Sequence, residues 1–256
     1  MSEADVVYVV EDGVARLTIN REAKRNSLSV SAVELLHEYL DRVKDDADVR
    51  AVLITGVGEK AFCSGADLAG GAGDGKVDVF KRYADLLKKI VSFPKPTVAR
   101  VNGYCLAGGM GLMLACDIVV AKKGSKFGTP EVNVGLWPMM IGALIFRNAV
   151  RKRAMEMILL GNRMSAEEAL EMGLVTRVVE DEELDSEVNK VLKVLAGKSP
   201  IGMKIGKEAF YAMADMGFED ALDFLSGKIA EVAATEDAIE GITAFIEKRD
   251  PVFKGK

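Results

Sequence analysis

The stretch NGYCLAGGMGL at residues 102–112 decides the fold, because it joins a short buried strand to a short buried helix through paired glycines. Glycine lets the backbone turn tightly and approach a ligand closely. The N-terminus of a helix carries a partial positive charge, so the N–H of Gly108 is suited to donate to a developing negative charge. Paired glycines alone are a weak signal, and the surrounding sequence has to support this interpretation.

Strands and helices are predicted to alternate on both sides of this turn. Residues 96–101 and 118–121 are apolar runs typical of buried strands, and the short helix between them is predicted over 112–115. Upstream, the patterns predict a hairpin over 6–19 around Asp12-Gly13, an amphipathic helix over 29–43, a buried strand over 49–55 and a helix over 79–91. Residues 68–76 are rich in glycine and acid and predict a loop. The N-terminal part is therefore an α/β core.

Beyond Ile141 the pattern is almost wholly helical, with breaks at Gly161-Asn162 and Gly173 and further helices over 184–195 and 202–245. No repeat or low-complexity linker separates these helices from the core. We therefore expect one domain over 1–256, with an α/β core over 1–200 and a helical C-terminal extension over 201–256. The apolar residues of 217–248 are expected to be buried against the core or against a neighbouring subunit.

Composition excludes several classes of protein. The 256 residues are 49% hydrophobic and 29% charged with 6 prolines, which excludes a disordered chain, a collagen-like repeat and a disulfide scaffold. An acidic N-terminus and the absence of a long apolar run favour a cytoplasmic protein with no membrane partner. Three dispersed cysteines and one histidine offer no metal site, and a net charge of -5 argues against a nucleic-acid partner. A phosphorylated ligand would need a local basic patch.

Two further motifs contain candidate chemistry. In KAFCSGADL at residues 60–68, small residues allow bare N–H groups to face an anion or a thioester oxygen, although a tightly packed turn has the same composition. In FGTPEVNVGLWP at residues 127–138, Glu131 lies among apolar residues that would raise its pKa and make it a proton carrier near neutral pH. A surface glutamate in a loop is the alternative.

These three motifs in this order resemble the crotonase superfamily, also called the enoyl-CoA hydratase/isomerase family. The segments 20–28, 161–169 and 237–241 extend the resemblance over nearly the whole chain. It implies an α/β spiral of β-β-α repeats with a helical C-terminal region, and trimers that pair into hexamers. It also implies an acyl-CoA thioester substrate, in which coenzyme A is part of the substrate and no separate cofactor is needed.

The resemblance implies a role for individual residues. Two backbone N–H groups, here those of Ala66 and Gly108, hold the thioester oxygen as an oxyanion, and Glu131 is the catalytic carboxylate. The substrate and coenzyme A contacts that we expect are Lys24, Arg25, Ser64, Gly65, Ala66, Asp67, Leu68, Gly108, Gly111, Trp137 and Lys248.

The chain departs from the hydratases of the family at one important position. Hydratases use two glutamates to hold water and move its proton, and the first of them falls on Gly111 here. One carboxylate suffices to move a proton between two carbons, so the pattern favours Δ3-Δ2-enoyl-CoA isomerisation. We expect Met139, Met140 and Ile141 to make an apolar pocket wall, and Met110 and Met139 to crowd a water molecule. The alternatives are enoyl-CoA hydration, decarboxylation of a malonyl-type thioester and a catalytically silent acyl-CoA binding protein.

Other reactive side chains are assigned structural roles. His37 lies in the amphipathic helix, away from the motifs, and the cysteines act as small apolar fillers. Asp67 and Asp117 are expected to fix backbone N–H groups, and the acidic run 180–183 is the solvated start of a helix. An RNA-binding member of the superfamily would need a basic surface helix, and residues 35–48 are too acidic to supply one.

Overall fold

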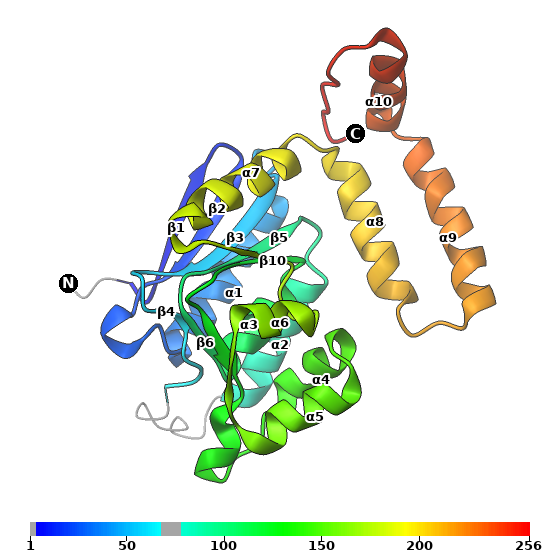
Figure 1. Cartoon of the computed structure of the whole chain (residues 1–256). Helices are drawn as coiled ribbons and strands as arrows, with labels where there is room; N and C mark the ends of the chain where they lie inside the picture. Colours follow the sequence, from blue (N-terminus) through cyan, green and yellow to red (C-terminus); the bar gives the residue numbers. More distant parts are fainter. Residues whose placement is uncertain (1–3, 68–77) are drawn as a thin grey trace.

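Two β-sheets form the body of the protein in this computed structural model, which describes residues 4–67 and 78–256 (Figure 1). The six-stranded sheet has the order β1 (Val6–Glu11), β2 (Val14–Ile19), β3 (Ala51–Gly56), β5 (Thr97–Val101), β7 (Ile118–Lys122) and β10 (Arg177–Val179). The four-stranded sheet has the order β4 (Ala61–Cys63), β6 (Tyr104–Leu106), β8 (Lys126–Gly128) and β9 (Arg163–Ser165). The predicted hairpin is confirmed as the antiparallel pair β1 and β2.

A β-β-α repeat connects the two sheets. Each of β3, β5 and β7 is parallel to its neighbour in the large sheet and is followed within a few residues by β4, β6 or β8 in the small sheet. Helix α2 (Val79–Val91) follows the first strand pair, and α3 (Gly108–Ala115) follows the second. A 3-10 helix, η3 (Pro130–Val134), and α4 (Met139–Asn148) follow the third. The chain therefore winds as the spiral expected from the resemblance.

The large sheet is covered on both faces. Helix α1 (Val30–Asp45), which Ser29 caps by accepting a hydrogen bond from Ala32 N, packs with α2 and α3 in the main hydrophobic core. A second core lies between the sheet and α7 (Leu184–Ala196), where Leu53, Val98 and Val188 meet. Every residue of β3 is buried as a result, which confirms the continuous apolar run as a strand covered on both faces.

The region beyond Ile141 is less helical than predicted. Helices α5 (Arg151–Leu160) and α6 (Ala166–Glu171) are present, and the breaks are confirmed by Gly161 and Gly173 at positive φ. Strands β9 and β10 were missed, however, because each has only three residues and no visible alternation. Helix α3 also begins at Gly108 rather than at Leu112, and η4 (Asp181–Glu183) lies in the acidic run before α7. The predicted loop 68–76 lies outside the described residues.

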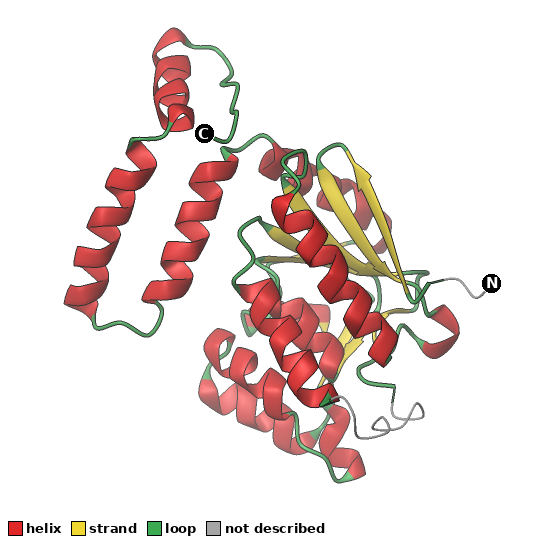
Figure 2. Cartoon of the chain, turned by 180° about the vertical axis from the view of Figure 1, so that it is seen from behind, coloured by secondary structure: helices red, strands yellow, loops and turns green. Residues whose placement is uncertain are grey.

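Three helices form an arm that projects from the α/β body: α8 (Pro200–Met213), α9 (Phe218–Ala233) and α10 (Glu236–Glu247) (Figures 1 and 2). The buried carboxylate of Asp237 accepts hydrogen bonds from Lys254 N and Gly255 N, which fastens the C-terminal tail to α10. Large apolar side chains of the arm do not reach the body of their own chain, and Phe218 and Phe245 are 78% and 85% exposed. No helix of the described residues is long and apolar enough to span a membrane. The division into a core and an extension of one domain stays a prediction.

Candidate active site

Strand pairing in the small sheet brings the two glycine-rich turns together. Strands β4 and β6 are parallel, with Cys63 opposite Cys105, so the residues that follow the two strands lie side by side. A Cβ atom on Gly65 would lie 2.8 Å from Ala107 Cβ and 3.3 Å from Gly108 N. Gly65 also has φ +98°, which side chains rarely adopt. Glycine at position 65 is therefore required for the close approach of the two turns.

The N–H groups of Ala66 and Gly108 are available to a ligand. On either side of Ala66, Leu28 N donates to Gly65 O and Asp67 N donates to Leu28 O, which leaves the Ala66 N–H with no acceptor within residues 4–67 and 78–256. Gly108 is the first residue of α3, and its N–H likewise has no acceptor in the described parts of the chain. The structure thus brings together the two donors that the resemblance implied.

Ala107 holds an uncommon backbone conformation directly before this helix. Its φ of 50° and ψ of -127° are disfavoured for a residue with a Cβ atom, and such a conformation costs about 1–3 kcal/mol. The Ala107 N–H donates to Gly128 O across 3.0 Å, which fixes the turn to β8. This conformation sets the direction in which the next N–H, that of Gly108, points.

Glu131 follows from the next strand of the same sheet. Leu106 lies opposite Gly128 in the parallel pair β6 and β8, so η3 begins next to the turn at Ala107. The Glu131 side chain is partly buried, and its Oε2 atom has no hydrogen-bond partner among the described residues. Burial raises the pKa of Glu131, and a hydrogen bond from its own backbone N–H opposes the change. A carboxyl group with a raised pKa is suited to take up and return a proton near neutral pH.

Position 111 faces Tyr83 of α2 and Ile141 of α4. A Cβ atom on Gly111 would overlap Tyr83 Oη and would lie 2.5 Å from Ile141 Cγ2. The expectation that Met110 and Met139 crowd this space is wrong, since Met110 is buried in the core and Met139 is 72% exposed. Both Tyr83 and Ile141 face position 111 from helices of other repeats. The role of Tyr83 was not evident from the sequence, because its helical spacing predicts only a core position.

Several predicted contact residues gather beside the Ala66 turn. Ser64 N donates to Arg25 O, and Lys24 and Arg25 are exposed at this edge of the body. Asp67 forms an ion pair with Arg21, whose Nη2 lies 2.7 Å from Asp67 Oδ2. This ion pair was missed in the sequence, where Asp67 was expected to bind backbone N–H groups. Leu68 lies outside the described residues.

Asp117 has the structural role that was predicted for it. Its carboxylate accepts hydrogen bonds from both the backbone N–H and the hydroxyl of Thr97, and it forms an ion pair with Lys207. These contacts tie β7 to β5 and to helix α8 of the arm.

Two predicted contact residues lie apart from this group. Trp137 is 43% exposed in the turn between η3 and α4, where Met139 N donates to its carbonyl. Lys248 caps the C-terminus of α10, and Figure 1 places α10 far from α3. A single chain therefore does not bring Lys248 to Ala66 and Gly108.

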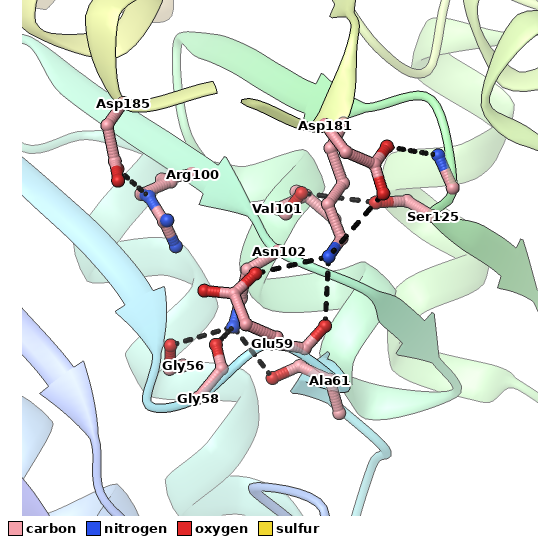
Figure 3. A network of polar contacts seen from close by, with 12 residues as sticks. Gly56, Gly58, Glu59, Ala61, Arg100, Val101, Asn102, Ser125, Asp181 and Asp185 are labelled. Carbon is pink, nitrogen blue, oxygen red and sulfur yellow. Dashed lines mark hydrogen bonds and ion pairs between the residues drawn. The ribbon is translucent and has the colours of Figure 1, made fainter. Parts of the chain in front are cut away.

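A buried polar network holds the turn that leads into β4 (Figure 3). Asn102 Nδ2 donates to Gly56 O at 2.9 Å and to Gly58 O at 2.5 Å, and Lys122 Nζ donates to Glu59 O at 3.0 Å. Asn26, which is also buried, donates to Ala61 O at 2.7 Å. Because β4 ends just before Ser64, these contacts fix the start of the segment that presents the Ala66 N–H.

The remaining reactive groups do not form a second centre. The three cysteines are buried, and burial raises the pKa of Cys63 to about 12, so a thiolate is not available near neutral pH. His37 is buried on α1 with Nε2 3.1 Å from Arg82 O. Within the part of the chain that the structure describes, no group of three His, Cys, Asp or Glu side chains is placed to hold a metal ion.

Comparison with known proteins identifies the family. The sequence model described as Enoyl-CoA hydratase/isomerase matches residues 10–256. The chain belongs to this family. The solved structure of an enoyl-CoA hydratase from Mycobacterium smegmatis superposes with a TM-score of 0.93 at 34% identity, covering 98% of this chain and 99% of the other. The family's fold, an α/β crotonase fold with two mixed sheets and C-terminal helices, is therefore confirmed.

Members with different printed activities are about equally similar to this chain. Enoyl-CoA hydratase domain-containing protein 3, mitochondrial, of Xenopus laevis is 36% identical and covers 95% of this chain and 84% of its own length. The 1,2-epoxyphenylacetyl-CoA isomerase of Escherichia coli is 35% identical and covers 96% of this chain and 97% of its own length. The chain is thus a crotonase-family protein, and its site has to decide between the activities. A cytoplasmic location stays a prediction.

Proposed function

We propose that this protein is a Δ3-Δ2-enoyl-CoA isomerase. The observation that carries the proposal is a single partly buried carboxylate, Glu131, beside two free N–H groups, with the space at Gly111 filled by Tyr83 and Ile141. Isomerisation needs one group that moves a proton between two carbons of the acyl chain. Hydration also needs a water molecule that is held and deprotonated, and the position of the other hydratase glutamate has no side chain here.

The reaction begins with the thioester oxygen accepting hydrogen bonds from the N–H groups of Ala66 and Gly108. The Glu131 carboxylate then removes a proton from C2 of the 3-enoyl chain, and the electron pair of that C–H bond delocalises into a dienolate. Its negative charge develops on the thioester oxygen, where the two donors stabilise it, and each such donor typically contributes about 10²–10³ in rate. Glu131 returns the proton to C4, which leaves the double bond between C2 and C3.

The coenzyme A part of the substrate is proposed to contact the basic edge of the body. Lys24 and Arg25 are exposed next to Ser64, so their side chains are free to approach phosphate groups while the thioester enters the site. Coenzyme A arrives and leaves with the acyl group, and no separate cofactor is included in the proposal.

Assembly into trimers or hexamers is proposed on the basis of the arm. Helix α9 buries no side chain within its own chain, and a groove between α8 and the body is lined by Leu87, Leu144 and Phe210. Burial of such a large apolar surface by another subunit is favourable. In an assembly, Lys248 on the arm would contact coenzyme A held by a neighbouring subunit, since it does not reach the site of its own chain.

Hydration is the second candidate, because the superposed Mycobacterium smegmatis structure is titled an enoyl-CoA hydratase. In this case Glu131 would activate water without help from position 111. Decarboxylation of a malonyl-type thioester and silent acyl-CoA binding are weaker alternatives, since the first needs a substrate carboxylate beside Glu131 and the second leaves that side chain without a purpose.

The Glu131→Gln variant tests the proposal. The amide keeps the shape of the side chain but does not take up a proton, so isomerisation of a 3-enoyl-CoA should fall by about 10²–10⁴. Binding of the substrate, measured by calorimetry, should change little. The matched control is Glu156→Gln on the exposed face of α5, which should retain full activity. Turnover by Glu131→Gln at the rate of the unaltered protein would contradict the assignment.

A further inference from the structure

Tyr83 connects helix α2 to the candidate site through a single hydrogen bond. Its side chain is 8% exposed, and its hydroxyl donates to the carbonyl oxygen of Gly108. Gly108 is also the residue whose N–H faces the ligand. The hydroxyl therefore holds the same residue that supplies one of the two donors.

The hydrogen bond restrains a flexible part of the backbone. Gly108 and Gly109 begin α3, and glycine has more conformational freedom than any other residue. Fixing the Gly108 carbonyl limits rotation of the first helical turn, and so limits the directions in which the Gly108 N–H points. Precise placement of such donors before the reaction is what makes them effective.

The same hydroxyl also closes the space above Gly111. Any side chain at position 111 would meet Tyr83 Oη at its first atom, and Ile141 Cγ2 lies 2.5 Å from that point. A Cβ atom on Gly108 would also lie 3.5 Å from Tyr83 Oη, so the hydroxyl stands between the two positions. A carboxylate or a bound water molecule therefore has no room there.

The hydroxyl keeps its proton under ordinary conditions. Burial raises the pKa of Tyr83 well above its usual value, and the negative charge of Glu131 adds to the effect after those of Cys63 and Cys105. Tyr83 is thus a hydrogen-bond donor at neutral pH and does not act as a base.

We propose that Tyr83 is a positioning residue that orients the Gly108 N–H and keeps a second proton carrier out of the space above Gly111. This inference rests on the proposed isomerase function. It adds the determinant of reaction type: the choice between isomerisation and hydration is made by a side chain of α2, outside the motifs that carry the resemblance.

The Tyr83→Phe variant tests the positioning role. It keeps the ring and removes the donor, so kcat for isomerisation should fall about tenfold while KM stays within about twofold, as expected for the loss of one hydrogen bond in the transition state. The control is Tyr8→Phe, which removes a buried hydroxyl without a partner among the described residues, on β1 and stacked on Tyr39. Equal kcat values for Tyr83→Phe and the unaltered protein would overturn the role.

A spectroscopic measurement separates this proposal from the proposed function. An acyl-CoA whose aromatic acyl group is conjugated with the thioester absorbs at longer wavelength when its carbonyl is polarised by hydrogen bonds. Binding should cause a smaller red shift in Tyr83→Phe than in the unaltered protein or in Tyr8→Phe, at similar affinity. This shift needs no turnover, so it tests Tyr83 even if the reaction is not isomerisation. Identical shifts in all three proteins would overturn the proposal.

Substitutions at position 111 test the exclusion. Gly111→Glu alone should not gain water addition to a 2-enoyl-CoA, because Tyr83 Oη and Ile141 Cγ2 obstruct the new side chain. Combining it with Tyr83→Phe and Ile141→Ala removes both atoms and should raise the ratio of hydration to isomerisation at least about tenfold. Brisk hydration by Gly111→Glu alone would show that the space is not closed and would overturn this part of the proposal.

Discussion

Glu131 lacks partners in the folded protein, and this has a consequence for stability. One of its oxygens is buried with no hydrogen-bond partner in the described parts of the chain, and burial raises the pKa of its carboxyl group. In the unfolded chain the same group has its ordinary pKa. The folded state therefore binds the proton more tightly, and stability falls as the pH rises from the ordinary value through the raised one.

The pH dependence of unfolding tests this account. Glu131→Gln should be more stable than the unaltered protein at mildly alkaline pH, by about 1 kcal/mol, because no buried charge remains without a partner. The difference should disappear at a pH below the ordinary pKa of glutamate, where both side chains are neutral. Urea unfolding at the two pH values measures it. A variant that is less stable at alkaline pH would mean that the carboxylate has a stabilising partner.

At the scale of elements, the site depends on how one three-residue strand is held. Strand β4 pairs with β6 over few residues, so the position of the Ala66 turn depends on the buried contacts of Asn102 and Asn26 with the preceding turn (Figure 3). Those carbonyl groups have no access to water to replace a lost donor. Loss of one amide should therefore affect both folding and the geometry of the site.

Asn102→Ala tests the role of this network. It leaves buried carbonyl oxygens without their donor and should reduce the free energy of unfolding by about 1–3 kcal/mol. It should also lower kcat, because the Ala66 N–H loses its fixed position. The matched control is Asn148→Ala, which removes an amide that donates to Leu144 O at the exposed end of α4 and should change stability by no more than about 0.5 kcal/mol. Equal effects of the two substitutions would refute the role of the network.

The sequence predicted the long elements of the body better than the short ones. The apolar run that forms β3 and the helical spacing of α1 and α2 have direct signatures, and the resemblance placed Ala66, Gly108 and Glu131 in turns that the structure brings near one another. Strands of three residues such as β6 and β9 have no periodicity to detect. The contact of Tyr83 with Gly108 was also hidden, because it depends on how α2 packs on α3 rather than on any local pattern.

For the whole molecule, the arm is the feature that a single chain leaves incomplete. Its helices leave Phe218, Ile229, Ile242 and Phe245 exposed, and exposed apolar patches of this kind are typical of contacts between subunits. The sequence predicted that these residues are buried, and the α/β body of the same chain does not bury them. We therefore expect them to pack against a second copy.

Sedimentation of arm variants tests this expectation. The unaltered protein should sediment as a trimer or hexamer at micromolar concentration, and Phe218→Asp combined with Phe245→Asp should shift it toward monomer. Val9→Asp, a similar change at an exposed position of β1, should leave the assembly intact. If the unaltered protein sediments only as a monomer, the assembly expectation is wrong and the arm must have another partner.

The direct test of the central claim is to give the unaltered protein a 3-enoyl-CoA and a 2-enoyl-CoA in parallel and to identify the products by mass spectrometry and absorbance. A single carboxylate at Glu131 predicts that the 3-enoyl thioester becomes the conjugated 2-enoyl isomer, without a change in mass, faster than the 2-enoyl thioester gains one water molecule. Rapid addition of water to the 2-enoyl thioester, with no shift of the double bond in the 3-enoyl thioester, would contradict the account.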